Sequence, residues 1–148
     1  MSYRMARANL KQLEWYLMDT YDVHVSFEKD GADEYWFDPD NFEEDRGVVS
    51  IDSSKPLSHQ LHVLLHEAGH VILRADSEKF KRRFPGSRRD TVDGRIEILR
   101  EEVLAWDKSV EVAERLGIKL NNKKWQKDYR DALRKYVEWV SKGDDDEK

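Results

Sequence analysis

The sequence predicts a single α+β domain in which amphipathic helices pack on a small sheet. Apolar residues recur at helical spacing in four segments, and between the first and second of these they alternate with polar residues in short segments. The chain has 148 residues, which is enough for one domain with a core and too few for two ordinary ones. We therefore expect one domain over residues 1–142, followed by a disordered acidic tail at residues 143–148.

The N-terminal part of the chain predicts one helix and three strands. Leucines at helical spacing give residues 3–19 an apolar stripe, and strict alternation over residues 23–27 indicates a half-buried strand. A Lys-Asp-Gly turn signal separates this strand from a second one at residues 34–37, so the two are expected to form a hairpin. An acidic loop then leads to a third short strand at residues 48–52.

The rest of the chain predicts three longer helices. Their expected ranges are residues 56–74, 95–116 and 123–141. Ser53 or Ser54 is expected to cap the first, with Pro56 in its first turn, and Asn121 or Asn122 to cap the last.

A basic segment separates the first two of these helices. Six of the eleven residues from 79 to 89 are Lys or Arg. The segment from residue 76 to residue 93 is expected to be a solvated loop or a short helix, and a lip facing a substrate or partner is the alternative.

The helix predicted at residues 56–74 carries His-Glu-x-x-His within an apolar frame. Residues four apart share one helix face, so His66 and His70 can point at one metal ion, and two imidazoles at this spacing suit zinc. Glu67 lies beside the open coordination position, where it can take a proton from a metal-bound water. Gly69 lowers helix stability by roughly 1 kcal/mol relative to alanine, so we expect it to serve packing or access. The alternative is a buried helix with two incidental histidines.

A catalytic zinc usually has three protein ligands, and the third must come from outside the motif. No histidine follows His70, so a downstream carboxylate is the expected substitute. Glu102 is the best candidate because it falls on the apolar face of its helix, where a carboxylate is costly to bury unless it is paired or bound. Glu101 is the alternative, although it groups with the polar side of that helix. Weaker candidates in the probable loop are Asp76, Asp90 and Asp93.

The other histidines are expected to play lesser parts. His62 shares the histidine stripe of the motif and is interpreted as a residue that packs against or supports the ligands. His59 is expected to be exposed, and His24 falls on the polar side of its strand.

The segment from His66 to His70, followed roughly thirty residues later by Glu102-Val-Leu-Ala105-Trp106, resembles small gluzincin-type zinc metallopeptidases. It is similar in plan to the minimal, often phage-borne peptidases of the ImmA/IrrE kind, and the resemblance covers about residues 23–116. It implies a minimal zincin-like fold: a helix, a small antiparallel or mixed three-stranded sheet, the motif helix and then a helix with the third-ligand glutamate. It also implies zinc ligation by His66, His70 and Glu102, with Glu67 as the catalytic base. In those proteins an asparagine usually follows the alanine, whereas here Trp106 does.

Composition excludes several other classes of protein. Apolar and charged residues each make up 39% of the chain, no apolar run approaches the length of a membrane span, and the N-terminus lacks a signal-peptide core. The absence of cysteine excludes a disulfide framework, a thiolate zinc site and a cysteine nucleophile. A net charge of −5 argues against nucleic-acid binding. These features fit a cytoplasmic protein.

Two functional hypotheses remain. The first is a zinc-dependent endopeptidase that acts on a protein or peptide substrate, with an extended substrate segment bound along residues 48–52. Candidates for the group that stabilises the oxyanion are Arg95, Arg100, Tyr129 and Tyr136. The second is a non-enzymatic interaction module that contains zinc and acts as an inhibitor or adaptor of a host or partner protein.

Overall fold

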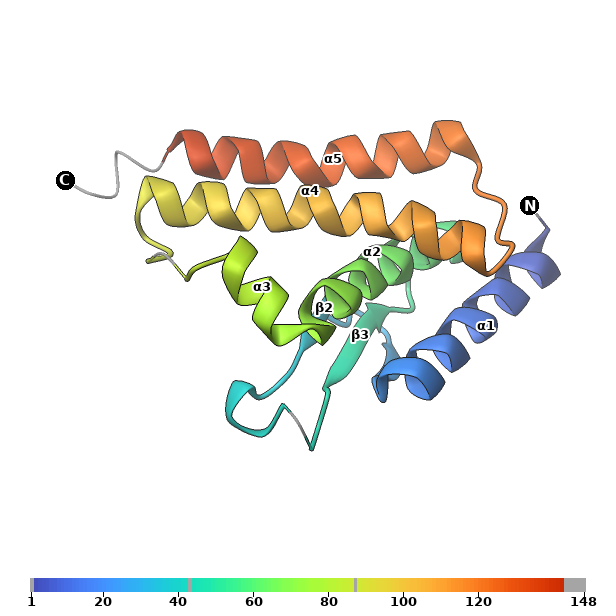
Figure 1. Ribbon diagram of the computed structural model, residues 1–148. Helices are drawn as coiled ribbons and strands as arrows, with labels where there is room; N and C mark the ends of the chain where they lie inside the picture. Colours follow the sequence, from blue (N-terminus) through green and yellow to red (C-terminus); the bar gives the residue numbers. More distant parts are fainter. Residues whose placement is uncertain (1, 43, 87, 143–148) are drawn as a thin grey trace.

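The computed structural model describes residues 2–42, 44–86 and 88–142. Its elements, in chain order, are α1 (Tyr3–Tyr21), β1 (His24–Glu28), β2 (Glu34–Trp36), a short 3-10 helix (Pro39–Asn41), β3 (Val48–Asp52), α2 (Leu57–Ala75), α3 (Ser77–Arg83), α4 (Val92–Arg115) and α5 (Asn122–Ser141) (Figure 1). The α+β zincin-like fold class predicted from the sequence is confirmed. The tail predicted at residues 143–148 lies outside the described residues.

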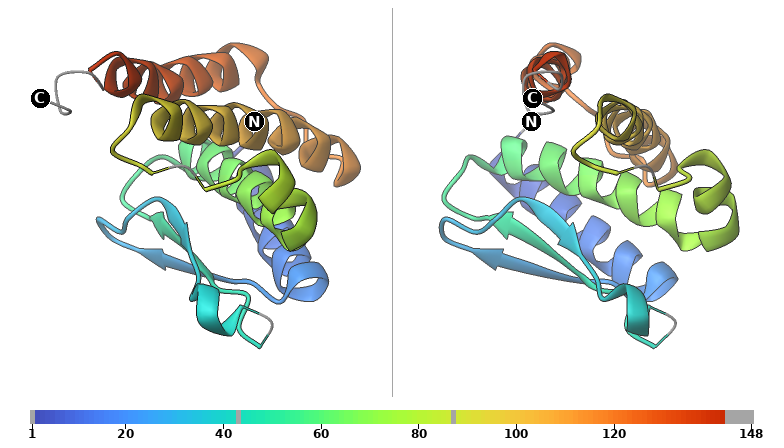
Figure 2. Two further views of the ribbon diagram at one scale, coloured as in Figure 1. Left: turned by 60° about the vertical axis from the view of Figure 1, so that its left-hand side comes forward. Right: turned by 90° about the vertical axis from the view of Figure 1, so that its left-hand side faces the viewer.

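The elements form layers around α2. Helices α1 and α2 pack against the sheet, α4 crosses α2 on the side away from the sheet, and α5 packs along α4 (Figure 2). The core lies between α1, α2 and β3, where Leu13, Leu17, Val49, Ile51 and Leu64 are fully buried. The periodicity of the sequence predicted the buried faces of α1 and α2, because the apolar residues of both helices pack into this core.

The three strands form a mixed sheet in the order β1-β3-β2. Strand β1 is parallel to β3, and β2 is antiparallel to β3. The predicted hairpin between the first two strands is therefore wrong. Strand β3 has the most buried residues, with Val49 and Ile51 fully covered, and it takes the central position between two more exposed strands.

The loop from β1 to β2 crosses the end of β3 instead of forming a tight turn. Asp52, the last residue of β3, accepts a hydrogen bond from the amide of Asp30 at 2.9 Å and donates its own amide to the Asp33 carboxylate at 2.8 Å. Gly31 allows the crossing to run close to β3, because a Cβ there would lie 3.1 Å from Ser50 Oγ. These contacts hold β2 on the far edge.

Some of the residues that cap the helices are the predicted ones. Asn121 caps α5, as predicted, and Asp76 caps α3, which is the short helix expected within the basic segment. The predicted serine cap of α2 is wrong, because Pro56 stands at the cap position and the Ser54 hydroxyl bonds to Asp52 at 2.6 Å. Helix α4 begins three residues earlier than predicted and is capped by Thr91.

Within residues 2–42, 44–86 and 88–142, no helix combines the length and apolarity needed to cross a bilayer.

Candidate metal centre

The candidate metal centre lies where α2 and α4 cross. A Cβ added to Gly69 would lie 2.1 Å from the carbonyl oxygen of Ala105, so the two backbones touch at this point. This confirms the expected packing role of Gly69. The close approach brings Glu101 and Glu102, which lie one turn before Ala105, onto the histidine face of α2.

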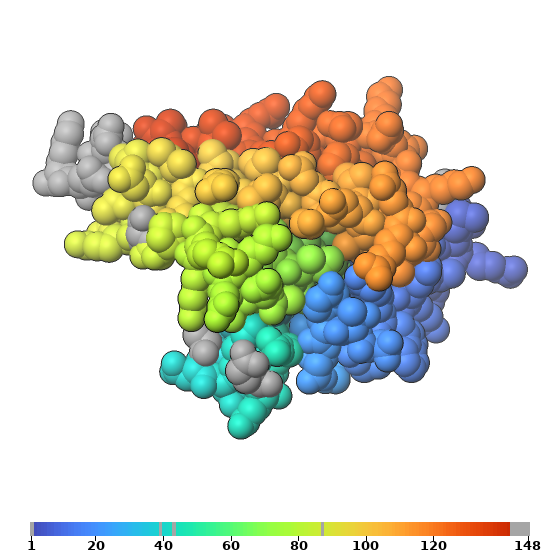
Figure 3. Space-filling view, viewed as in Figure 1, coloured from blue at the N-terminus to red at the C-terminus, as the bar shows by residue number. Residues whose placement is uncertain are grey.

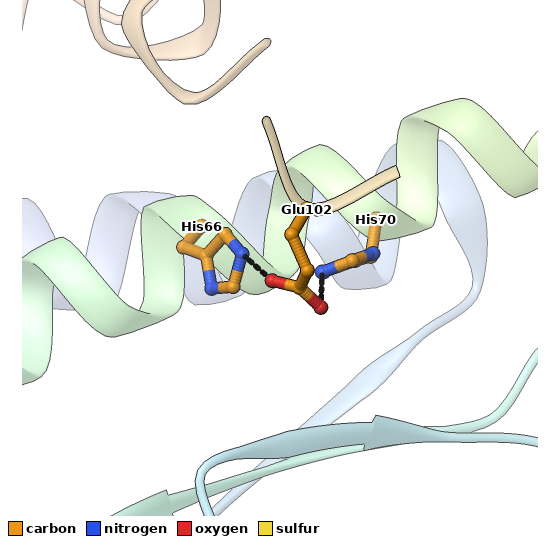
Figure 4. A group of neighbouring side chains, drawn as sticks. All are labelled: His66, His70 and Glu102. Atoms are coloured by element: carbon orange, nitrogen blue, oxygen red, sulfur yellow. Dashed lines mark ion pairs between the residues drawn. The ribbon is translucent and has the colours of Figure 1, made fainter. Parts of the chain in front are cut away.

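The three predicted ligands converge at this crossing. His66 Nε2 lies 2.8 Å from Glu102 Oε2, and His70 Nε2 lies 3.2 Å from Glu102 Oε1 (Figure 4). One ligand atom from each of the three residues lies within 4.8 Å of the others. Two imidazoles and one carboxylate form the donor set that a catalytic zinc site uses.

Two buried atoms of this cluster indicate that a cation fits between the side chains. His66 Nε2 and Glu102 Oε2 are close together, yet neither makes a hydrogen bond with good geometry to any described group. Buried polar atoms without such partners are costly, and a shared cation would satisfy both. Ligand atoms on one tetrahedral zinc are roughly 3.3 Å apart, which is close to the separations found here.

Glu101 supports the centre from the other side of His70. Its Oε2 lies 2.5 Å from His70 Nδ1, and its Oε1 accepts from Arg74 Nη2 at 2.8 Å. Glu101 is buried, so the expectation that it lies on the polar side of its helix is wrong. Helix α4 packs against both α2 and α5, and a single apolar stripe does not describe a helix covered on two sides. The bond to Nδ1 fixes the ring of His70 with Nε2 toward Glu102.

Burial and mutual contacts shift the pKa values of these groups. Burial raises the pKa of Glu67 to about 8. Burial also disfavours a charged His70, but its bonds to Glu101 and Glu102 outweigh this and raise the pKa of His70 to about 10. Burial opposes ionisation of Glu102 as well, yet its contacts with His66 and His70 hold its pKa well below the usual range. Burial lowers the pKa of His66. Without metal, His70 and Glu67 therefore both hold a proton at neutral pH, while Glu102 is ionised.

The centre opens into a cleft of about 460 Å³ between β2 and the helices. Glu67, His70, Glu102 and Tyr136 line the cleft, together with residues 33–37. Glu67 is placed beside the ligands, with Oε1 3.9 Å from His66 Nδ1. Tyr136 comes from α5, and burial together with the negative charge of the nearby Glu102 raises its pKa far above the usual value. It is therefore a hydrogen-bond donor at any physiological pH.

The remaining oxyanion candidates point elsewhere. Arg95 donates to the carbonyl of Trp139 at 2.9 Å, and Arg100 donates to the carbonyl of Arg83 at 3.2 Å. Tyr129 stacks on Trp125 with ring centroids 5.3 Å apart. Of the four candidates, Tyr136 is the one that lines the cleft.

The other candidate ligands also have different surroundings. His62 is buried, and its Nδ1 lies 2.7 Å from Asp128 of α5; Nδ1 of the half-exposed His59 lies 3.4 Å from the same carboxylate. These two histidines thus connect α2 to α5. His24 is exposed on β1. Among the weaker aspartate candidates, Asp76 caps α3, Asp90 pairs with Arg88 at 2.7 Å and Asp93 is exposed in the first turn of α4.

Strand β3 (residues 48–52), which was expected to bind an extended substrate segment, lies in the wrong place for that role. Strand β3 is paired on both sides, so its backbone groups are already used. Strand β2 has a free edge and lines the cleft.

Two residues that contact the candidate metal centre were not predicted from the sequence. Arg74 binds Glu101, and the indole of Trp106 stacks on the His66 ring with centroids 4.4 Å apart. Each has a sequence signal: Arg74 follows His70 by four residues, and Trp106 follows Glu102 by four. Helical spacing places each beside a ligand.

Comparison with known families agrees with this geometry. Residues 18–105 match the model of a peptidase family described as the IrrE N-terminal-like domain. The chain belongs to this family. The match includes the His-Glu-x-x-His motif and Glu102, and it indicates a metallopeptidase-like domain. No match was found among curated proteins or among solved structures.

Proposed function

We propose that this IrrE N-terminal-like domain is a zinc-dependent metallopeptidase that hydrolyses peptide bonds in a protein substrate. The observation that carries the proposal is the convergence of His66, His70 and Glu102 on one point, with the buried Glu67 beside them at the wall of a cleft. A structural zinc site is normally closed by four protein ligands. Three ligands and a neighbouring carboxylate suit catalysis better.

The residues of the centre have distinct roles in this proposal. His66, His70 and Glu102 would hold the ion, and Glu101 keeps His70 in the orientation that ligation needs. When bound there, zinc would supply a Lewis acid for the peptide carbonyl and for the attacking water. Glu67 accepts a proton from the attacking water and passes it to the leaving amine.

Tyr136 is the proposed donor to the oxyanion of the tetrahedral intermediate. It lines the same cleft as Glu67, and its hydroxyl keeps its proton because burial raises its pKa. A preorganised donor of this kind stabilises charge that develops only during the reaction.

The free edge of β2 is the proposed site for the substrate backbone. An extended peptide can add to an unpaired strand edge through main-chain hydrogen bonds. Strand β2 is paired with β3 on one side, and its residues line the cleft that holds Glu67. A peptide on the outer edge of β2 would therefore pass the metal centre.

The test is a comparison of zinc-loaded wild type with Glu67→Gln on a mixture of peptides and unfolded proteins. The proposal expects new N-termini with the wild type and none with Glu67→Gln, while both proteins hold the same amount of zinc. If the zinc-loaded wild type cuts nothing in a broad set of substrates, the peptidase proposal fails. An effect on a partner protein that survives Glu67→Gln would favour the interaction module instead.

A further inference from the structure

A second hollow lies beside the catalytic cleft, with phenylalanine side chains in its walls. It has a volume of about 440 Å³ and is lined by Phe37, Phe42, Phe80 and Phe84, among others. The rings of Phe37 and Phe42 are 5.0 Å apart, and those of Phe80 and Phe84 are 4.8 Å apart. In the space-filling view, α3 lies directly above the cyan segment that follows β2 (Figure 3). The two ring pairs belong to these two segments and the residues next to them.

Arg74 joins the two ring pairs. Its guanidinium carbon lies 5.1 Å from the centroid of Phe37 and 4.4 Å from that of Phe80. The charge of Arg74 is already matched by Glu101, to which it donates two hydrogen bonds. Arg74 therefore lines the hollow as a paired cation that already contacts two of its rings, so its charge is matched at this wall.

The hollow adjoins the proposed active site, because Phe37 and Arg74 line both. Phe37 directly follows β2, along which we place the substrate backbone. Arg74 follows His70 by one helical turn, or about 6 Å. An extended peptide advances about 3.3 Å per residue, so the hollow lies one or two residues from the bond at the metal.

Three of the four phenylalanines in the walls of this hollow are only partly covered by the rest of the described chain. Phe37, Phe42 and Phe80 are each only half-buried, although aromatic residues are usually well covered by their own fold. Concave sites with apolar walls and a few polar groups at the edge are typical of ligand-binding pockets of this volume. The polar side chains at this hollow include Asp40, Glu44 and Lys81, so both signs of charge are present.

We infer that the hollow between Phe37, Phe42, Phe80 and Phe84 receives a bulky apolar side chain of the peptide substrate, one or two residues from the bond that is cut. The inference rests on the proposed peptidase function and names its substrate class. The peptide backbone pairs with β2, and an aromatic or long aliphatic side chain enters the hollow and packs against its phenylalanine rings. A charged side chain at that position is rejected, because the apolar walls would strip its water without supplying a partner.

The first measurement is cleavage by the zinc-loaded protein of peptides that carry Phe or Ala at the selected position. Wild type should prefer Phe by about tenfold or more in kcat/KM, since apolar pockets discriminate on this scale. Two variants act on different walls: Phe42→Ala removes a ring, and Ser77→Leu fills the space. Either should lower the preference below about threefold with zinc content unchanged. Trp15→Ala changes an exposed aromatic residue on α1 and is the matched control. This variant should keep the wild-type preference for Phe over Ala.

The second measurement does not depend on catalysis. N-acetyl-phenylalaninamide and N-acetyl-alaninamide are titrated into the zinc-loaded protein, and the aromatic resonances of Phe37 and Phe80 are followed by NMR. The inference expects shifts with the phenylalanine amide that are absent in Ser77→Leu and absent with the alanine amide. Equal responses to both amides, or a Ser77→Leu variant that responds to the phenylalanine amide as the wild type does, would overturn the inference. Absence of any cleavage would instead count against the peptidase proposal. The titration would still show whether the hollow binds an apolar side chain.

Discussion

The backbone of Gly69 touches the carbonyl of Ala105, with room for no more than a hydrogen on the glycine α-carbon. Two opposing effects can be compared at this contact. Helix propensity alone would make Gly69→Ala stabilising by roughly 1 kcal/mol. A Cβ placed 2.1 Å from a backbone oxygen must push the two helices apart, and such overpacking costs about 1–3 kcal/mol or more.

We therefore predict that Gly69→Ala is destabilising and that it weakens zinc binding, because Glu102 moves away with α4. Urea unfolding of the metal-free protein and zinc titration measure the two effects. A variant as stable as wild type, or more stable, would contradict the packing described for this crossing.

Glu101 is predicted to control zinc affinity without being a ligand. Glu101→Gln keeps the shape of the side chain but removes the charge that orients and polarises His70. Loss of such a supporting carboxylate typically weakens metal binding by about tenfold to a hundredfold. Competition with a chelator measures the change. Glu114→Gln, an exposed position on the same helix, is the control and should bind zinc as wild type does.

Tyr136 is predicted to act on catalysis and not on metal binding. Tyr136→Phe removes the proposed donor to the oxyanion and should lower kcat by about 10²–10³, with KM nearly unchanged. Steady-state kinetics on any peptide that the wild type cuts provides the measurement, together with zinc content. A fall in zinc content that parallels the fall in kcat would assign Tyr136 to support of Glu102 instead.

Asp52 is predicted to make stability depend on pH. Hydrogen bonds from the Ser54 hydroxyl and amide, and from the Asp30 amide, hold the pKa of Asp52 below its usual value. A carboxyl whose pKa is lower in the folded state stabilises the fold above the unfolded pKa of about 3.9, and this contribution is lost as pH falls through the folded pKa. Asp52→Asn should therefore be less stable than wild type at neutral pH, and the difference should shrink below about pH 4.

Urea unfolding of the two metal-free proteins at several pH values tests this prediction. If the free energies of unfolding of wild type and Asp52→Asn differed by the same amount at every pH, the three hydrogen bonds would not be stabilising the charge of Asp52.

The convergence of His66, His70 and Glu102 was open to prediction because it depends on helical spacing. His66 and His70 share a face by virtue of their four-residue separation, and Glu102 stood out as a carboxylate on an apolar stripe. Gly69 was a further signal, because a glycine inside a good helix has to be explained by a close neighbour. Each of these inferences uses information within one helix, where geometry is fixed by the backbone.

Strand order and the surroundings of Glu101 were not open to prediction in this way. Alternating residues show that a strand is half-buried, but they do not show which strand lies beside it, and the loop from Asp30 to Asp33 carries β2 across the end of β3. The polar side assigned to Glu101 is buried because both α2 and α5 cover α4. Both errors come from contacts between elements distant in sequence.

The most direct test of the account is the zinc content of protein purified without added metal or an affinity tag, measured by elemental analysis for wild type, Glu102→Ala and the exposed control Glu114→Ala. The account predicts about one zinc per chain in the wild type and the control, and a large loss in Glu102→Ala, because two histidines alone leave the site incomplete. A wild type that holds no zinc even when zinc is supplied would contradict the account, as would a Glu102→Ala variant that binds zinc as tightly as the wild type.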